Sequence, residues 1–215
     1  MKFKHGKNLS IKDKRSVFIG KEVVVGNDVT IYENNRIDGK TVIEDGVTIL
    51  PGCYIVDTKI GKNTVVNHSQ SEKAEIGKEC SIGPFARLRP NAKIKDFAKI
   101  GNFVEIKNAT IGCGTKVSHL AYVGDADLGD NCNIGCGAIF VNYDGVNKHR
   151  TSVGNSCFIG SNCNIIAPVS IEDQSYICAG TTVTENIKYD DFVIGRVRQE
   201  VKENRAHEYL NKEKK

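Results

Sequence analysis

Large aliphatic residues recur at every sixth position along most of the chain. Between Ile19 and Val183 this spacing, with occasional single-residue slips and two longer interruptions, gives 27 positions that take 18 of the 23 isoleucines. We call these positions slots. An α-helix would need a spacing near 3.6 residues, and hairpin strands do not keep a fixed six-residue bend, so the repeat predicts a coil of short strands.

Two positions beside each slot support this prediction. The residue after the slot is often glycine, which we interpret as a sharp bend that needs permissive backbone dihedrals. The residue two before the slot is small or β-branched almost everywhere, as in Ala74, Ala98 and Thr115. Because positions two apart in a strand face the same side, each hexapeptide should bury one large and one small side chain and then turn.

The repeat predicts an all-β protein. Three hexapeptides make one triangular coil of a parallel β-helix, so the 27 slots give a hexapeptide-repeat prism of about nine coils, ~43 Å tall. We expect an N-terminal extension at 1–16, the β-helix at 17–195, and a short helical C-terminal arm at 196–215, where Glu, Lys and Arg dominate. The segment 66–76 fits the repeat least well.

Composition narrows the class of protein without naming a function. The chain has 215 residues, of which 40% are hydrophobic and 26% are charged, and its formal net charge is +4. Much of the positive excess lies at the two ends, which does not favour a nucleic-acid partner. No apolar stretch approaches the ~20 residues of a membrane span, and the polar start argues against a signal peptide. We therefore expect a cytoplasmic protein.

The cysteines have a simple interpretation in the predicted coil. Five of the eight fall in the small inward position, where a free cysteine packs as a small hydrophobe rather than serving in a disulfide or metal site. These five are Cys53, Cys80, Cys132, Cys157 and Cys163. The other three fall outside that position and are expected to be partly exposed: Cys113, Cys136 and Cys178.

The longest break in the repeat lies between Val141 and Ser152, where seven extra residues bulge out. Loops on a rigid scaffold commonly carry binding residues. This one offers Asn142, Tyr143 and Lys148 for hydrogen bonding. The alternative is a solvated turn built on Asp144-Gly145.

Charged side chains flank several neighbouring slots. Arg87 and Arg89 lie one on each side of inward Leu88, and Glu105 and Lys107 flank the slot of the next coil. All should point outward, and the planar fork of arginine matches phosphate oxygens.

His119 follows the slot of the coil after that, so we expect it to stack with these charged side chains in one outward patch. Its ordinary pKa of about 6.5 suits a general base at neutral pH. The alternative is a surface or interface histidine without a catalytic role.

Several segments together resemble a known family. They are GPFARLRP, GNFVEIKNATIG, SHLAYVGDADLGDNCNIGCG, VNYDGVNKHRT, IGSNCNIIAPV and AGTTVT, in that order. They are similar to the acetyltransferase half of the bacterial bifunctional N-acetylglucosamine-1-phosphate uridylyltransferase/glucosamine-1-phosphate acetyltransferase. The resemblance covers roughly 17–196 and is strongest over 83–184.

The resemblance implies a left-handed β-helix that assembles as a homotrimer with active sites between subunits. It also implies a cytoplasmic enzyme that transfers acetyl from acetyl-CoA to the 2-amino group of glucosamine 1-phosphate. The product, N-acetylglucosamine 1-phosphate, is a precursor of UDP-N-acetylglucosamine and so of peptidoglycan in the cell wall. No metal is required for this acetyl transfer.

The family's site residues carry over by position. His119 would be the general base, and Glu105 would orient the substrate amine or the histidine. Residues implied to bind the sugar phosphate are Arg89, Lys107, Tyr122, Asn133, Asn142, Tyr143 and Lys148. Residues implied to bind acetyl-CoA are Cys136, Asn142, Tyr143, Ser161, Ala179 and Arg196.

Three departures from the family pattern stand out. No glycine-rich nucleotide-transfer segment is present, so we expect no uridylyltransferase activity from these residues. Cys136 stands where the family usually has alanine, which narrows the expected cofactor slot. Arg198 stands where proline is usual, which leaves the geometry of the tail open.

Three other functions fit part of the sequence. An acyltransferase of the same fold could use a different acceptor, such as a nucleotide-linked amino sugar. A zinc lyase on this fold would need three convergent histidines, of which only His119 is suitably positioned. A non-catalytic trimeric scaffold is the third alternative.

Overall fold

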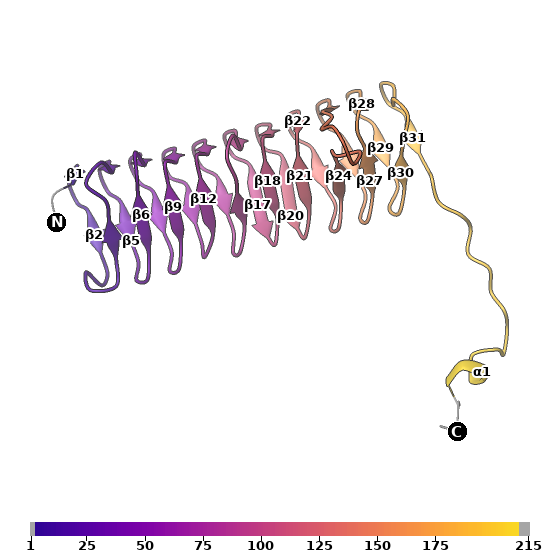
Figure 1. Cartoon of the computed structure of the whole chain (residues 1–215), viewed down its shortest axis with the longest axis horizontal. Helices are drawn as coiled ribbons and strands as arrows, with labels where there is room; N and C mark the ends of the chain where they lie inside the picture. The colour runs from indigo at the N-terminus through magenta and orange to yellow at the C-terminus, as the bar shows by residue number, and fades with distance from the viewer. Residues whose placement is uncertain (1–2, 211–215) are drawn as a thin grey trace.

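The computed structural model describes residues 3–210, and the strands from β1 (Lys4–His5) to β31 (Phe192–Val193) form a triangular prism of parallel strands (Figure 1). Each side of the prism is one sheet, and the chain passes through sheets A, B and C in turn, so three successive strands complete one coil. The parallel β-helix with almost no α-helix is the predicted fold class, and it is confirmed. One short helix, α1 (His207–Leu210), lies in the C-terminal tail, which runs away from the prism.

The strands are short, and their bounds follow the repeat. Sheet A contains β1 (Lys4–His5), β4 (Val24–Val25), β7 (Val42–Ile43), β10 (Lys59–Ile60), β13 (Glu75–Ile76), β16 (Lys93–Ile94), β19 (Thr110–Ile111), β22 (Ala126–Leu128), β25 (Thr151–Val153) and β28 (Ser170–Ile171). Sheet B contains β2 (Ser10–Ile11), β5 (Thr30–Ile31), β8 (Thr48–Ile49), β11 (Val65–Val66), β14 (Ser81–Ile82), β17 (Lys99–Asn102), β20 (Lys116–His119), β23 (Asn133–Ile134), β26 (Phe158–Ile159), β29 (Tyr176–Ile177) and β31 (Phe192–Val193). Sheet C contains β3 (Phe18–Ile19), β6 (Arg36–Asp38), β9 (Tyr54–Val56), β12 (Gln70–Glu72), β15 (Arg87–Leu88), β18 (Glu105–Lys107), β21 (Tyr122–Gly124), β24 (Ile139–Val141), β27 (Asn164–Ile166) and β30 (Thr182–Val183).

The strand register stacks slot upon slot. Ile60 pairs with Ile43 on one side and with Ile76 on the other, and the same alignment holds along each sheet. These side chains are buried in one continuous core together with the small inward residues. The aliphatic ladders therefore supply the apolar burial that holds neighbouring coils together.

The coil count is the part of the fold prediction that is wrong. Residues 3–210 form about eleven coils rather than nine, because strands occur where no aliphatic slot was counted. Strands β1 and β2, before Val17, pair with β4 and β5.

Another uncounted slot holds Ser71, between Val66 and Ile76. Its side chain is buried, and its hydroxyl lies 2.9 Å from the hydroxyl of Thr58. Because a hydrogen-bonded polar group is tolerated in a core, the coil continues through the segment that fits the repeat least well.

The glycines after the slots serve close packing rather than an unusual backbone angle. Apart from Gly83, none of those that occupy this position has a positive φ, so the interpretation of permissive dihedrals is wrong. A Cβ on Gly61 would come 2.5 Å from the carbonyl carbon of Gly77 on the next coil. Positive φ instead occurs three residues after the slot, at residues such as Asn63 and Asn131, where asparagine tolerates it.

The cysteines follow their predicted burial with one exception. The five in the inward position are buried, Cys113 is half-buried and Cys136 is exposed. Cys178, expected to be partly exposed, is buried. Strand β31 covers it, and the Cys178 N–H donates to the Val193 carbonyl at 2.9 Å.

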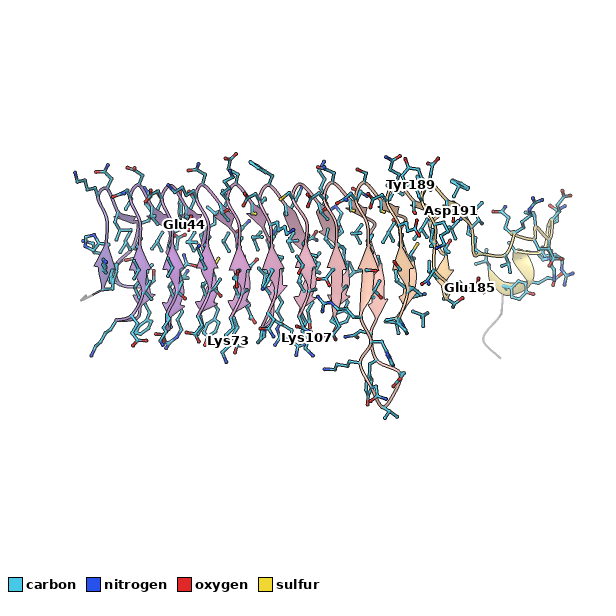
Figure 2. All side chains as sticks on the ribbon, turned by 90° about the horizontal axis from the view of Figure 1, so that it is seen from above. Glu44, Lys73, Lys107, Glu185, Tyr189 and Asp191 are labelled. Atoms are coloured by element: carbon cyan, nitrogen blue, oxygen red, sulfur yellow. The ribbon has the colours of Figure 1, made fainter. Side chains whose placement is uncertain are left out.

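Two edges of the prism border sheet C, and the candidate site involves both. Edge BC comprises the turns from sheet B into sheet C, and edge CA comprises the turns from sheet C into sheet A. Residues 142–150 project from edge CA as a loop (Figures 1 and 2). In the described part of the chain, no helix has the length and apolar character needed to cross a membrane.

Candidate active site

Edge BC aligns four of the predicted site residues in one column. His119 ends β20, and the register of sheet B stacks it between Asn102 on one coil and Cys136 on the next. Ser161 and Ala179 continue the column on the two following coils. The backbones of successive members are thus about one strand spacing, ~4.8 Å, apart along the axis of the prism.

One hydrogen bond of His119 favours a particular tautomer of the neutral ring. Its Nδ1 lies 2.7 Å from the Asn102 side-chain oxygen, which can only accept. Nδ1 therefore donates, and in the neutral ring Nε2 is left with a free lone pair. Since the side chain is exposed, Nε2 is available as a proton acceptor.

An exposed apolar ridge lies beside this column. Phe85, Phe103 and Leu120 occupy equivalent turn positions on successive coils, and each side chain is more than half exposed. The rings of Phe85 and Phe103 stack with centroids 5.6 Å apart. All three residues have positive φ, which is unfavourable for bulky side chains. Because positive φ recurs at this turn position along the prism, it is the exposed apolar surface of the ridge that is typical of an interaction site.

Several residues predicted to bind acetyl-CoA lie on the last coils of edge BC, toward the C-terminal end of the prism. Arg196 follows β31, and its Nη1 donates to the Ala179 carbonyl at 3.0 Å. The column of Cys136, Ser161 and Ala179 therefore ends at a guanidinium group. Asn142 and Tyr143, which the resemblance also assigns to the cofactor, lie apart from this column, on edge CA.

Edge CA gathers positive charge. Arg89 forms an ion pair with Glu105 at 2.8 Å. The side chain of Lys148 contacts Lys107 and, with burial and the charge of Arg89, lowers the pKa of the Lys107 ammonium. Three cations thus converge on one corner, and Figure 2 shows Lys107 at the edge from which the loop projects. Such an arrangement suits an anion with several oxygens.

The projecting loop is a hydrogen-bonded hairpin. Tyr143 and Lys148 form an antiparallel bridge across it. At its tip, the Asp144 carboxylate accepts the N–H groups of Val146 and Asn147 at 2.7 and 2.6 Å, and it lies 2.6 Å from His149 Nε2. The Asn147 N–H, His149 and the Val146 N–H lower the pKa of Asp144 to about 2. The Asp144-Gly145 turn is therefore present, and it orders a hairpin rather than a loose loop.

One hydrogen bond and one ion pair fix the hairpin to the prism. At its start, buried Asn142 donates to the carboxylate of Asp125. At its end, Arg150 pairs with Asp127, with its Nη2 2.6 Å from Oδ1. Sequence reasoning missed Asp125 and Asp127, and it also missed Asn102. Asn102 and Asp125 each precede a recognised residue, His119 and Asn142, by 17 positions, the length of one coil, whereas Asp127 pairs with Arg150, which sequence reasoning did not single out.

The predicted residues fall into two groups on one chain, so the expectation of a single outward patch that includes His119 is wrong. Arg89, Glu105, Lys107, Tyr122, Asn142, Tyr143 and Lys148 lie on sheet C or edge CA, whereas His119, Asn133, Cys136, Ser161, Ala179 and Arg196 lie on sheet B or edge BC. Gly124 is the register partner of Lys107 and follows His119 by five residues, a span of up to ~17 Å.

Three of the predicted side chains, those of Tyr122, His119 and Glu105, contact other residues of the prism. The ring of Tyr122 lies over Gly124, where a Cβ would collide with it. The partner of the His119 imidazole is Asn102, whereas Glu105 contacts Arg89.

No group of three or more His, Cys, Asp and Glu side chains within residues 3–210 has an arrangement that could hold a metal ion.

Comparison with protein families identifies the repeat. Residues 73–108 match the bacterial transferase hexapeptide (six repeats), and residues 150–185 match the hexapeptide repeat of succinyl-transferase. The chain carries transferase hexapeptide repeats. Both matched segments lie within the prism. Transferase hexapeptide repeats support the left-handed form of the β-helix.

Curated relatives confirm the resemblance recognised in the sequence. The bifunctional protein GlmU of Clostridium acetobutylicum is 46% identical over 201 residues, 93% of this chain and 44% of that protein. GlmU of Geobacillus sp. is 48% identical over 202 residues, 94% of this chain and 44% of that protein. The chain therefore spans less than half the length of the relatives it matches.

Solved structures resemble the chain more distantly. The UDP-N-acetylglucosamine acyltransferase of Arabidopsis is 17% identical, with a TM-score of 0.48, over 84% of this chain and 67% of that one. Similarity at this level carries no functional argument.

Proposed function

We propose that this chain is a glucosamine-1-phosphate N-acetyltransferase that uses acetyl-CoA. The observation that carries the proposal is the convergence of Arg89, Lys107 and Lys148 on one corner of the prism. Like charges repel, so three cations side by side are favoured where an anionic ligand meets them. A phosphomonoester offers the matching charge and oxygens.

Proton transfer is the task proposed for His119. An ammonium is not a nucleophile, so the 2-amino group of the acceptor must lose a proton as it attacks the thioester carbonyl. Nε2 of His119 takes that proton, while the hydrogen bond from Nδ1 to Asn102 stabilises the resulting imidazolium. The tetrahedral intermediate then collapses with cleavage of the C–S bond, and the His119 imidazolium returns the proton to the departing sulfur, so that the amide remains and CoA leaves as the thiol. A positioned base of this kind typically contributes ~10²–10⁴-fold.

Acetyl-CoA is proposed to lie along edge BC. The column of Cys136, Ser161 and Ala179 leads from His119 to Arg196, whose guanidinium would meet a phosphate or carbonyl oxygen of the cofactor. The thioester end would then lie beside His119. Cys136 adds a sulfur at the point where the acyl group would pass.

A homotrimer in the cytoplasm is part of the proposal. The width of sheet C separates His119 from the cation cluster, so a compact site needs edge BC of one copy to face edge CA of another. The apolar ridge of Phe85, Phe103 and Leu120 supplies surface for that contact. Closed symmetric assembly would build the same site at every interface.

Release of CoA thiol tests the proposed function. The purified chain should release thiol when acetyl-CoA and glucosamine 1-phosphate are both present, and only at background rate with either one alone. Glucosamine 6-phosphate and a nucleotide-linked amino sugar serve as alternative acceptors. A higher rate with one of these would replace the proposed acceptor, and no release from a folded oligomer would end the enzymatic interpretation in favour of a scaffold.

A further inference from the structure

Asp125 is a buried carboxylate at the turn after β21. Its residue is 7% exposed, and its φ of 47° lies in the left-handed region, which aspartate tolerates better than most residues. Aspartate is seldom buried unless it is paired. The partners of this carboxylate therefore indicate what it does.

Asp125 joins three consecutive coils. Its Oδ1 accepts the Asn108 side-chain amide at 2.5 Å, and its Oδ2 accepts the amide of Asn142. Burial alone would raise the pKa of the Asp125 carboxyl, but these two hydrogen bonds and the charges of Lys107 and Lys148 outweigh burial and lower the pKa. The group is thus held as an anion at neutral pH.

The same carboxylate faces the cation cluster. The contact with Lys148, burial and the charge of Arg89 lower the pKa of Lys107, whereas the charge of Asp125 acts in the opposite direction. Glu105, the other nearby carboxylate, is engaged by Arg89. Asp125 is therefore a buried carboxylate whose charge favours the protonated form of Lys107 and offsets part of the repulsion from its cationic neighbours.

We propose that Asp125 is a positioning residue for the anionic group of the acceptor. Through Asn142 it fixes the start of the hairpin, which carries Lys148. Through its charge it holds Lys107 beside Lys148. The inference rests on the proposed function for the identity of the anion, and Asp125 itself does not contact the reacting atoms.

The substitution Asp125→Asn tests this role because it keeps the shape and removes the charge. One nitrogen of the new amide would face an amide donor of Asn108 or Asn142, so one of the two hydrogen bonds is lost. We expect the KM for glucosamine 1-phosphate to rise by ~10-fold or more. The kcat should stay within ~3-fold, because His119 on edge BC is not altered.

A pH profile separates this role from a merely structural one. The pKa of Lys107 is lowered by Lys148 and by the charge of Arg89, and it is raised by the charge of Asp125. Removing the Asp125 charge should therefore lower the pKa of Lys107 further. Lys107 would then lose its proton at lower pH. The alkaline limb of kcat/KM for the acceptor should therefore move to lower pH in Asp125→Asn.

Asp57→Asn is the matched control. Asp57 occupies the same turn position, with a φ of 49°, and its carboxylate accepts the Lys40 N–H at 2.9 Å. It lies four coils away, so its substitution should leave both KM values unchanged. The double variant Asp125→Asn with Asn108→Asp moves the carboxylate one coil down, and should recover part of the acceptor affinity and of the pH profile.

Hydrogen exchange of residues 142–150 gives a readout that does not need activity. The hairpin amides should exchange faster in Asp125→Asn than in the wild type and in Asp57→Asn. If the wild type releases no thiol, the proposed function fails, and the exchange result still decides whether Asp125 orders the hairpin. An unchanged acceptor KM, pH profile and exchange rate in Asp125→Asn would overturn the positioning role.

Discussion

Edges BC and CA border the same sheet, yet they are built differently. On edge BC, His119 has one neutral partner, Asn102, and lies beside exposed apolar side chains such as Leu120. On edge CA, Lys107 lies near two other cations, Arg89 and Lys148, and near the buried carboxylate of Asp125. A base needs an accessible lone pair, whereas an anion site needs several fixed cations. The comparison teaches that a change at His119 on edge BC should alter the rate, whereas a change at the cations on edge CA should alter the affinity for the acceptor.

The largest effect is expected at the base. His119→Ala should lower kcat by ~10²–10⁴-fold with little change in either KM, because it removes the proton acceptor alone. Thiol release at saturating substrates measures this, and thermal unfolding checks the fold. His5→Ala, at an exposed histidine on the first coil, serves as the control. Near-normal turnover in His119→Ala would remove this residue as the base.

A smaller effect of a different kind is expected at the cations. Arg89→Ala should raise the acceptor KM by ~10–100-fold and change kcat by less, because a hydrogen bond to a charged group contributes about 1.5–3 kcal/mol. Arg36→Ala is the control: Arg36 lies on the same sheet and pairs with Asp38 at 2.8 Å, far from the hairpin. An unchanged acceptor KM in Arg89→Ala would contradict a phosphate role for edge CA.

The sequence predicted the prism well because the repeat is local. Ile19 and its successors each report the same buried environment, so the six-residue spacing alone fixes strand, turn and core. Ser71 shows where this reasoning ended. Its slot is polar, and only the hydroxyl of Thr58 on the preceding coil explains why it is buried.

The site was harder to predict because its contacts join residues one coil apart. Sequence reasoning found His119 and Lys107 through their residue types and the family resemblance. It did not find Asn102 or Asp125, because a pairing such as Asn102 with His119 depends on the register of stacked strands. That register shifts wherever a coil gains or loses a residue, so it became certain only in three dimensions.

A change of charge beside the base should shift its pH dependence. Asn102→Asp places a carboxylate against the His119 imidazole, and a neighbouring negative charge favours the protonated ring. Because the base acts when neutral, the acidic limb of kcat/KM should move to higher pH. Asn102→Ala, which adds no charge, should lower kcat by only ~2–10-fold. Identical acidic limbs in the wild type and Asn102→Asp would show that this contact does not tune the base.

The smallest effect is expected away from both edges. Lys59 pairs with Glu44 at 3.3 Å on sheet A, and both side chains are partly exposed. Lys59→Ala should change the Tm by no more than ~2 °C and leave all kinetic constants at their wild-type values. A change in acceptor KM in this variant would show that the separation between the two edges and the rest of the surface is false.

Complementation between two inactive variants tests most directly whether the two edges meet across a subunit interface. One variant carries His119→Ala, and the other carries Arg89→Ala with Lys107→Ala; each is assayed alone and after co-refolding in equal amounts at low acceptor concentration. Random assembly should restore about a quarter of the wild-type rate, since about one interface in four then combines an intact edge BC with an intact edge CA. A mixture no more active than the separate variants would contradict a site shared between copies.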